Sequence, residues 1–249
     1  MKFAIISAGE GSRLSQEGVQ LPKPLVQLNG EAMIDRLIHI FAKNGAEQVI
    51  IIINDEVQAT KDHLAKLKRN SVLPLEVVVK TTPSSMHSFY EISPFLKGEK
   101  FCLTTVDTIF REKEFTCFIE AFKKSKEDGM MAVTDYIDDE KPLYISTDDQ
   151  LNITGFYDTM TPDCKYISGG IYCLGPQAID VLHSCMEKGI SRMRNFQRQL
   201  IADGLRLKAY PFSKILDVDH ASDIIKAEAF LNNLSSTYKC NFLGADNKQ

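Results

Sequence analysis

Hydrophobic positions in the first half of the chain follow two alternating patterns. The run QVIIIIN at 48–54 has the length and the β-branched composition of a strand that is buried on both faces. Similar runs predict strands at 2–7, 75–80 and 100–106. Between them, apolar residues recur at helical spacing and predict helices at 31–44, 57–70, 85–96 and 115–128, the last of them ended by Gly129. This βαβα order predicts an α/β fold with a doubly wound, mostly parallel mixed sheet and helices on both faces, a Rossmann-like three-layer arrangement.

The second half of the chain has shorter apolar runs. They predict a mixed region with strands at 130–136, 143–146, 151–157, 165–174, 207–210 and 214–218, and helices at 176–188, 191–203 and 220–234. Neither a repeat nor a linker separates the two halves. We therefore expect one domain over 1–249, with halves at 1–130 and 131–235 and a polar tail at 241–249 that frays.

Bulk composition narrows the class of protein. The chain is 44% hydrophobic and 25% charged, and its net charge of −4 argues against nucleic acid as a partner, because phosphate-backbone binding needs a clustered excess of basic residues. Met1 leads directly into a strand, and no apolar run reaches the ~20 residues of a membrane helix, so we expect a cytoplasmic protein without a membrane partner. The six cysteines lack metal-ligand spacing, and Cys102, Cys117 and Cys173 are expected as small core residues of a reduced protein.

The first strand runs straight into a glycine loop, AGEGSRL at 8–14. Gly9 and Gly11 allow a backbone turn whose exposed N–H groups form a concave site for anions. Ser12 adds a hydroxyl donor, and Arg13 adds a planar fork that matches phosphate oxygens. Lys23 follows between two prolines, which restrict its backbone. These residue types together indicate a site for a polyphosphate.

Two commoner phosphate loops are excluded. A Walker loop ends in Gly-Lys-Ser/Thr, whereas Ser12 and Arg13 follow Gly11 here. A dinucleotide loop has a third glycine at the position of Leu14. The glycine pair alone would also suit a tight turn followed by a surface arginine, but Arg13 together with Lys23 favours phosphate binding.

The order AGxGSRL, seven residues, then PKPL resembles the signature of the sugar nucleotidyltransferases, also called nucleotide-sugar pyrophosphorylases. The match is specific in this segment and patchy later, and Gln16-Glu17-Gly18 stands where the family often has Pro-x-Thr. The resemblance implies a magnesium-dependent enzyme that joins a nucleoside triphosphate to a sugar 1-phosphate and releases pyrophosphate. The half at 1–130 would then bind the nucleotide and the half at 131–235 the acceptor.

The resemblance also implies roles for the residues of the loop. Arg13 and Lys23 are the expected catalytic residues, Arg13 binding the β- and γ-phosphates and Lys23 the α-phosphate. The nucleotide is expected to contact Ala8, Gly9, Gly11, Ser12, Arg13, Lys23 and Ser85. Ser85 lies in the segment KTTPSSMHS at 80–88, where Ser85 and Ser88 offer hydroxyls to the base, although a helix start capped by Ser84 or Ser85 is the alternative.

Two carboxylates are candidate Mg²⁺ ligands. Asp107 ends an apolar strand, and ligands of open α/β sheets bind at such strand ends. A turn or helix-capping aspartate is the alternative. The segment LDVDH at 216–220 resembles the closing segment of the family, which implies Asp217 as the second ligand, although Asp219 could exchange roles with it. We expect His220 in the first turn of a helix rather than in the metal site.

Acceptor contacts are expected from two segments. SGGIY at 168–172 resembles a family strand in which a glycine, Gly170 here, lets the sugar approach the backbone. Asp158 stands for a glutamate of the family, but the lysine that follows it there is missing. Lys165 or Lys141 is a candidate to replace that lysine.

Two other functions remain open at this point. A cytidylyltransferase for phosphocholine or another non-sugar phosphate would need an aromatic cage for a quaternary ammonium group. The aromatic candidates in the acceptor half are Tyr136, Tyr144, Phe156, Tyr157 and Tyr166. A non-catalytic nucleotide sensor on the same fold is the other alternative, but a sensor has no need for both catalytic cations and both carboxylates. Neither the base, the acceptor nor the oligomeric state follows from the sequence.

Overall fold

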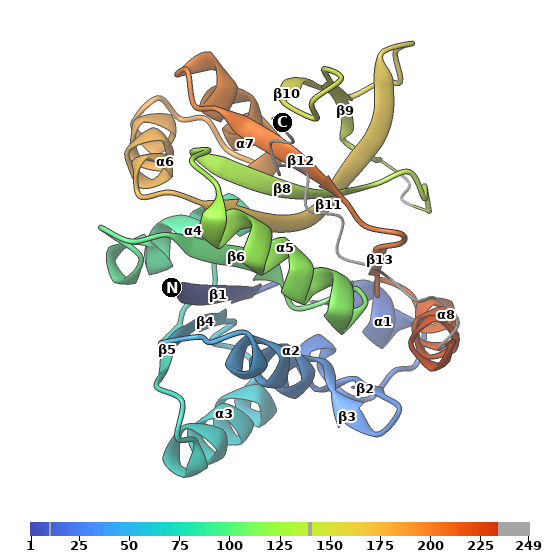
Figure 1. Cartoon of the computed structure of the whole chain (residues 1–249). Helices are drawn as coiled ribbons and strands as arrows, with labels where there is room; N and C mark the ends of the chain where they lie inside the picture. The colour runs from blue at the N-terminus through green and yellow to red at the C-terminus, as the bar shows by residue number, and fades with distance from the viewer. Residues whose placement is uncertain (10, 139–140, 234–249) are drawn as a thin grey trace, which may run out of the picture.

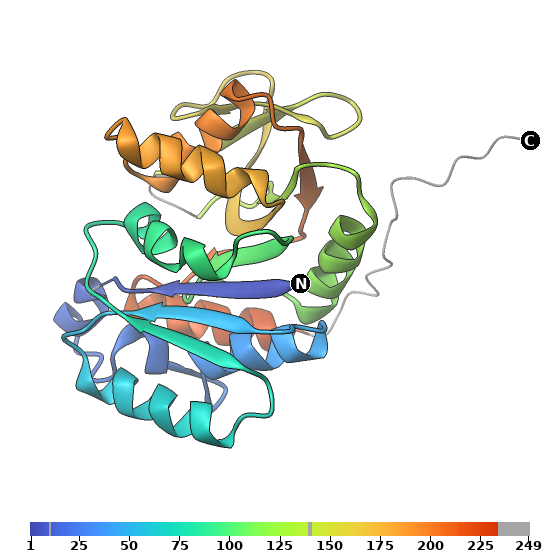
Figure 2. The same ribbon diagram turned by 90° about the vertical axis from the view of Figure 1, so that its left-hand side faces the viewer.

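The computed structural model describes residues 1–9, 11–138 and 141–233. The parallel part of its central sheet follows the β-branched runs of the first half. Strand β1 (Lys2–Ser7) lies between β4 (Val49–Ile53) and β6 (Phe101–Thr105), and β4 also pairs with β5 (Leu75–Val79). All three pairings are parallel, as predicted (Figure 2).

The second half extends the same sheet with mostly antiparallel strands. The long strand β11 (Cys164–Leu174) pairs with β6 through its last residues and with β9 (Tyr144–Thr147) through its first, and it curves between the two (Figure 1). The other strands here are β8 (Gly129–Thr134), β10 (Ile153–Tyr157) and β12 (Leu207–Pro211). Strand β8 joins β11 to β12, and β10 pairs with β9. The mixed sheet and its strands in both halves confirm the predicted fold class.

Helices cover both faces of the sheet. One face carries α2 (Met33–Lys43), α3 (Gln58–Asn70), α5 (Glu112–Lys124) and α8 (Ala221–Asn232), and the other carries α4 (Ser85–Ile92), α6 (Gln177–Glu187) and α7 (Met193–Ala202). Side chains of β1 alternate between the two cores, because Phe3 and Ile5 enter the first while Ala4 and Ile6 enter the second. Burial on both faces explains why these strands read as continuous apolar runs.

Short elements gather beyond the carboxyl ends of the parallel strands. They are α1 (Ser12–Gln16), the hairpin of β2 (Gln27–Leu28) and β3 (Glu31–Ala32), and the small antiparallel pair of β7 (Thr108–Ile109) and β13 (Leu216–Asp217). One-turn 3-10 helices at Lys23–Leu25 and Ser93–Phe95 complete the chain that the structure describes. Helix α8 is the element that follows β13, and this last described helix lies beside α1, the first helix of the chain (Figure 1).

Four sequence predictions about these elements were wrong. The helix expected at 115–128 is α5, which begins three residues earlier, and Gly129 starts β8 instead of ending a helix. A Cβ atom at Gly129 would lie 2.7 Å from Leu207 and 2.9 Å from Leu174, so close sheet packing explains this glycine. Strand β5 lies at the edge of the sheet and leaves Val79 43% exposed rather than buried. Residues 31–32 form a strand instead of the first turn of α2.

The cysteines match the expectation only in part. Cys102, Cys164, Cys173 and Cys185 are free and buried. Cys117 is disulfide-bonded, which the prediction of a fully reduced protein did not foresee. The tail expected at 241–249 lies outside the described residues. Among the described helices, none has both the length and the apolar character that crossing a bilayer requires.

Candidate active site

A cavity of about 450 Å³ opens where the sequence placed the phosphate loop, at the carboxyl ends of β1 and β6. All of the predicted nucleotide-binding and catalytic residues line it, with one predicted metal ligand and one carboxylate expected only as its alternative. They are Ala8, Gly9, Gly11, Ser12, Arg13, Lys23, Ser85, Asp107 and Asp219. The fold therefore brings residues from both ends of the chain to one cavity.

The glycine loop packs directly on the segment that carries Lys23. Gly11 has φ +61°, and a Cβ atom there would lie 3.0 Å from the Cβ of Lys23. Lys23 opens a one-turn helix between Pro22, whose backbone is extended, and Pro24, and its carbonyl accepts from the N–H of Val26 at 3.2 Å. Glycine at position 11 thus lets the loop and the lysine share one wall of the cavity.

Two cations and two carboxylates alternate in the wall of this cavity. Lys23 Nζ lies 2.5 Å from Asp107 Oδ2 and 2.8 Å from Asp219 Oδ1, and Arg13 lies 3.4 Å from Asp219 Oδ2. The side chains of Lys23 and Asp107 are only 14% and 17% exposed. Burial lowers the pKa of Lys23, but the two carboxylates outweigh that effect and raise it. Lys23 therefore carries its charge at any physiological pH.

Asp217 takes a different position from Asp219. It faces Thr108 across the β7–β13 pair, and the N–H of the next residue, Val218, donates to the carbonyl of Asp107 at 3.1 Å. Asp217 lines two neighbouring cavities but not that of the glycine loop, whereas Asp219 lines the cavity of the glycine loop and one of those neighbours. Asp107 and Asp217 thus sit on adjoining backbone segments, and Asp219 is engaged by the two cations.

The turn before α4 was expected to contact the base. Ser84 caps the helix, because its Oγ accepts from the N–H of His87 at 3.4 Å and lies 2.8 Å from the His87 ring. Ser88 is buried and its hydroxyl lies 2.6 Å from that of Thr82. Ser85 lines the cavity, so both the capping and the lining interpretations of this serine cluster have a structural counterpart.

A second cavity of about 320 Å³ adjoins the first on the side of β11. The two share Ser84, Ser85 and Thr105 in their walls. The second is also lined by Lys141, Ser168, Gly170, Tyr172, Arg192, Arg194, Gln197 and Asp217. Gly170 has φ +72°, and a Cβ atom there would lie 3.3 Å from the hydroxyl of Thr108. Gly170 therefore lies in the wall where an acceptor contact was expected.

Sequence reasoning missed Arg192. It precedes α7 and has φ +81°, which residues other than glycine rarely adopt. Its exposed side chain lines the second cavity. A backbone conformation leaves no pattern of apolar positions, so the only available signal was the basic composition of the segment SRMR at 191–194.

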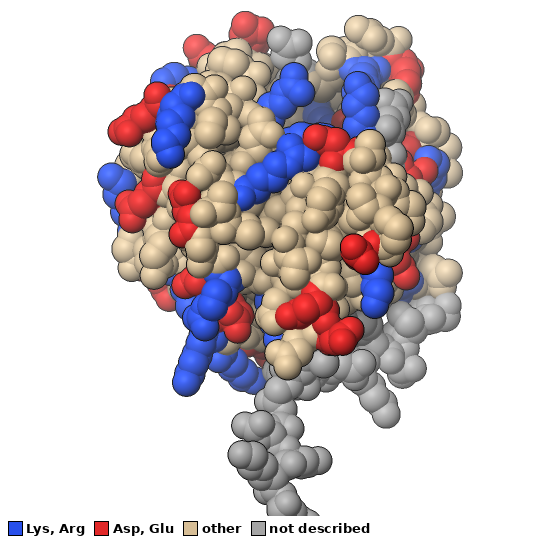
Figure 3. Space-filling view, turned by 90° about the horizontal axis from the view of Figure 1, so that it is seen from above, with Lys and Arg blue, Asp and Glu red and all other residues tan. Residues whose placement is uncertain are grey.

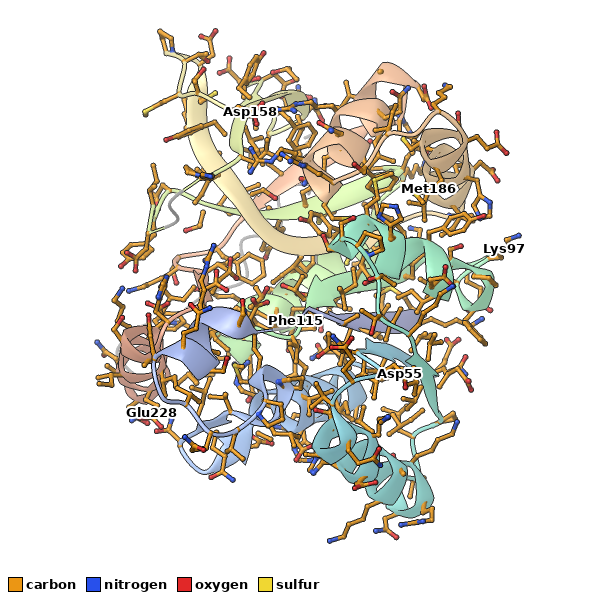
Figure 4. All side chains as sticks on the ribbon, turned by 180° about the vertical axis from the view of Figure 1, so that it is seen from behind. Asp55, Lys97, Phe115, Asp158, Met186 and Glu228 are labelled. Carbon is orange, nitrogen blue, oxygen red and sulfur yellow. The ribbon has the colours of Figure 1, made fainter. Side chains whose placement is uncertain are left out.

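Asp158, the expected acceptor contact, lines none of the cavities described here. It lies at the end of β10, on the outer side of the second half (Figure 4), with its side chain 56% exposed. Hydrogen bonds from Arg198 at 2.8 Å and Arg194 at 2.5 Å lower its pKa. Asp158 thus holds Arg194, which also donates to the carbonyl of Lys141 at 3.0 Å.

Of the two lysines proposed to replace the missing one, Lys141 lines the second cavity, whereas Lys165 is exposed and lines none of those described. Two of the five aromatic residues considered for a cage, Tyr144 and Tyr157, face each other across the β9–β10 pair. Of the five, only Tyr136 lines a described cavity, a third one of about 460 Å³, and its ring lies 3.9 Å from the ammonium of Lys214. Charged side chains of both signs are interspersed over the face of the second half (Figure 3).

Comparison with known proteins agrees with this geometry. The model of the nucleotidyl transferase family matches residues 2–233. A glucose-1-phosphate cytidylyltransferase of Salmonella typhi is 22% identical over 73% of this chain and 78% of its own. A mannose-1-phosphate guanyltransferase of Candida glabrata is 25% identical over 73% of this chain and 52% of its own.

A solved structure has the same fold. The inositol-1-phosphate CTP transferase from T. maritima superimposes with a TM-score of 0.75 at 17% identity, covering 92% of this chain and 97% of that chain. The match of the family model over residues 2–233 confirms the resemblance seen in the glycine-loop segment. The chain belongs to the nucleotidyl transferase family.

Proposed function

We propose that this protein is a magnesium-dependent sugar-1-phosphate nucleotidyltransferase, which converts a nucleoside triphosphate and a sugar 1-phosphate into a nucleotide sugar and pyrophosphate. The observation that carries the proposal is the cavity of the glycine loop, in which Lys23 lies between Asp107 and Asp219 with Arg13 beside them. Relatives that act on glucose 1-phosphate and mannose 1-phosphate support a sugar phosphate as the acceptor.

The triphosphate would lie along the glycine loop. Its N–H groups and the Ser12 hydroxyl would cradle the phosphates, as expected for a backbone anion site. Arg13 would bind the β- and γ-phosphates, and Lys23 would neutralise the charge that grows on the α-phosphate. Asp219 pairs with both cations in the cavity and so holds their charge near the place where the phosphates would lie.

The acceptor would enter the adjoining cavity, where Arg192, Arg194 and Lys141 offer positive charge to its phosphate. An oxygen of that phosphate attacks the α-phosphorus of the triphosphate and forms the new P–O bond. The bond from the α-phosphorus to the bridging oxygen breaks, and pyrophosphate leaves with the electron pair. Positioning of the two substrates and charge stabilisation suffice, because the attacking group is already an anion.

The carboxylates suit Mg²⁺, which prefers one or two protein carboxylates together with phosphate oxygens and water. Asp107 and Asp217 would hold it, because the β7–β13 pair places their backbones side by side and both residues face substrate cavities. When bound, the ion neutralises phosphate charge. Among the described residues, no group of three or more acidic, His or Cys side chains is arranged to hold a metal ion, so the substrates themselves would complete the coordination.

The test is pyrophosphate release in the presence of magnesium. Each common triphosphate is paired in turn with glucose 1-phosphate, mannose 1-phosphate, an amino-sugar phosphate, inositol 1-phosphate and phosphocholine. Release with a sugar phosphate supports the proposal and identifies both substrates. Release with phosphocholine alone would replace the sugar by a choline acceptor. Triphosphate binding without release from any pair would favour the non-catalytic sensor.

A further inference from the structure

We propose that Glu17 is a positioning residue that joins the phosphate loop to the turn bearing Asp219, and thereby orients Arg13 and Lys23, the cations that line the cavity, for binding a triphosphate. The inference rests on the proposed function, because it concerns the same triphosphate site. Glu17 lies in the segment in which the chain departs from the Pro-x-Thr common in the family. It lines none of the described cavities, so it would act through other residues.

The backbone around Glu17 is fixed by the end of α1. Gly18 has φ +88° and donates to the carbonyl of Ser15 at 3.1 Å, while Val19 donates to that of Leu14 at 3.0 Å. These two bonds are those of a Schellman motif. Leu14 is buried in the core, and the N–H of Glu17 donates to the carbonyl of Arg13 at 3.1 Å. Glu17 is therefore held at a defined distance from Arg13.

The carboxylate of Glu17 spans to the other end of the chain. Its Oε1 lies 2.6 Å from His220 Nδ1, and its Oε2 accepts from the N–H of Ala221 at 2.6 Å. These partners lie more than 200 positions later in the sequence. The His220 ring and the Ala221 N–H lower the pKa of Glu17, so the carboxylate is charged at neutral pH.

Helix α8 leaves this N–H group for an outside partner. Asp223 accepts from the N–H groups of His220 at 2.9 Å and Asp219 at 3.2 Å. Its carboxylate therefore satisfies the two N–H groups that precede Ala221. Ala221 is the first residue of α8, and an unsatisfied N–H at a helix start favours an anion. Glu17 supplies that anion from α1, across the fold.

Two sets of contacts therefore join the segment of the phosphate loop and α1 to the turn before α8. Glu17 bonds to the residues just after Asp219, and Asp219 itself bonds to Arg13 and Lys23. The links close a ring that runs from Arg13 through α1 to Glu17, across to Ala221 and back through Asp219. Without Glu17, the links between the turn and the described residues of the loop segment would be reduced to the 3.4 Å contact between Arg13 and Asp219 and the bond from Lys23 to Asp219.

The chain contains a matched control, a second carboxylate that connects an N-terminal segment to α8 but lies outside the described cavities. Glu228, on the outer side of α8 (Figure 4), accepts from the N–H of Asn29 at 2.9 Å and so joins the same helix to the β2–β3 turn. Like Glu17, it connects an N-terminal segment to α8 by a carboxylate and a backbone N–H, across 199 positions. Glu228 lines none of the described cavities and contacts neither Arg13 nor Asp219 in the recorded bonds.

The experiment measures binding of magnesium and inorganic tripolyphosphate, a probe that needs no knowledge of the base, to the wild type, Glu17→Ala, Glu17→Gln and Glu228→Ala. Loss of a residue that orients ligand-binding groups typically weakens binding about 10–100-fold. We expect such a rise in Kd for Glu17→Ala, a smaller one for Glu17→Gln, which keeps an acceptor for Ala221, and none for Glu228→Ala. Amide exchange at the start of α8 should quicken only in the Glu17 variants.

The outcomes separate the inference from the function on which it rests. A wild type that binds no tripolyphosphate would count against the proposed function. A wild type that binds it, together with a Glu17→Ala variant of equal affinity and a similar Tm, would overturn the role of Glu17. Equal losses in Glu17→Ala and Glu228→Ala would overturn it too, because they would mean that any tie to α8 has the same effect.

Discussion

Lys23 Nζ lies 2.8 Å from a carboxylate oxygen of Asp219, a residue 196 positions later in the chain. The contact is possible because α8 follows β13 directly and returns the chain to the carboxyl ends of the parallel strands. Asp107 takes a second hydrogen of the same ammonium at 2.5 Å. One lysine thus joins the glycine loop, the end of β6 and the turn before α8, so substitutions here report on the whole site.

Replacing Lys23 by alanine should leave the fold intact and remove most of the activity. The side chain lines a cavity and belongs to neither core, and loss of one preorganised charge contact to a transition state costs on the order of 100-fold in rate. Pyrophosphate release and thermal unfolding measure the two effects. Lys43→Ala, which removes an exposed ion pair with Glu112, is the control and should change neither. Near-normal turnover in Lys23→Ala would contradict the assignment.

Substitution of single carboxylates should separate the metal site from the cation-holding site. We expect Asp107→Asn and Asp217→Asn to raise the magnesium concentration needed for half-maximal activity by about 10-fold or more, because each would remove a ligand. Asp219→Asn should instead raise the KM for the triphosphate, since it loosens Arg13 and Lys23. Magnesium titrations of activity and Mn²⁺ binding measured without substrates check the assignment. The reverse pattern would make Asp219 the second ligand.

Arg192 offers a test in which function and stability move in different directions. Glycine adopts φ +81° without strain, so Arg192→Gly should unfold at the same Tm as the wild type or above it. The KM for the acceptor should nevertheless rise about 10- to 100-fold, the range expected for loss of a charged hydrogen bond. Arg206→Ala, which removes an exposed arginine outside the described cavities, is the control. An unchanged acceptor KM would exclude Arg192 from the acceptor site.

These examples show which features a sequence reveals. The strands β1, β4 and β6 were predictable because burial on both faces imposes continuous apolar runs, and the loop at 8–14 because phosphate binding needs particular residue types at particular spacing. Arg192 was not predictable, because the feature that distinguishes it is a backbone angle, which no sequence pattern records. Asp158 was placed as an acceptor contact, but its pairing with two arginines from α7 depends on tertiary packing that no local pattern records.

Packing of the same kind leaves one carboxylate, Glu114, buried at the start of α5. Its side chain is fully buried, Oε2 accepts from the N–H of Ser213 at 3.2 Å, and Oε1 has no partner among the described residues. Burial raises the pKa of Glu114, and the bonds from Ser213 offset this only in part. The folded protein therefore binds this proton more tightly than the unfolded chain does.

The sign of the pH dependence follows. Because its pKa is higher in the folded state, Glu114 favours folding most below its unfolded value, and this contribution is lost as the pH rises from about 4.5 through the folded pKa. Glu114→Gln should thus be more stable than the wild type at neutral pH, with the difference shrinking towards pH ~4.5. Urea unfolding across this range measures it, with Glu112→Gln, an exposed neighbour paired to Lys43, as the control. Parallel stability curves for the wild type and Glu114→Gln would mean that Glu114 is already neutral or well solvated throughout.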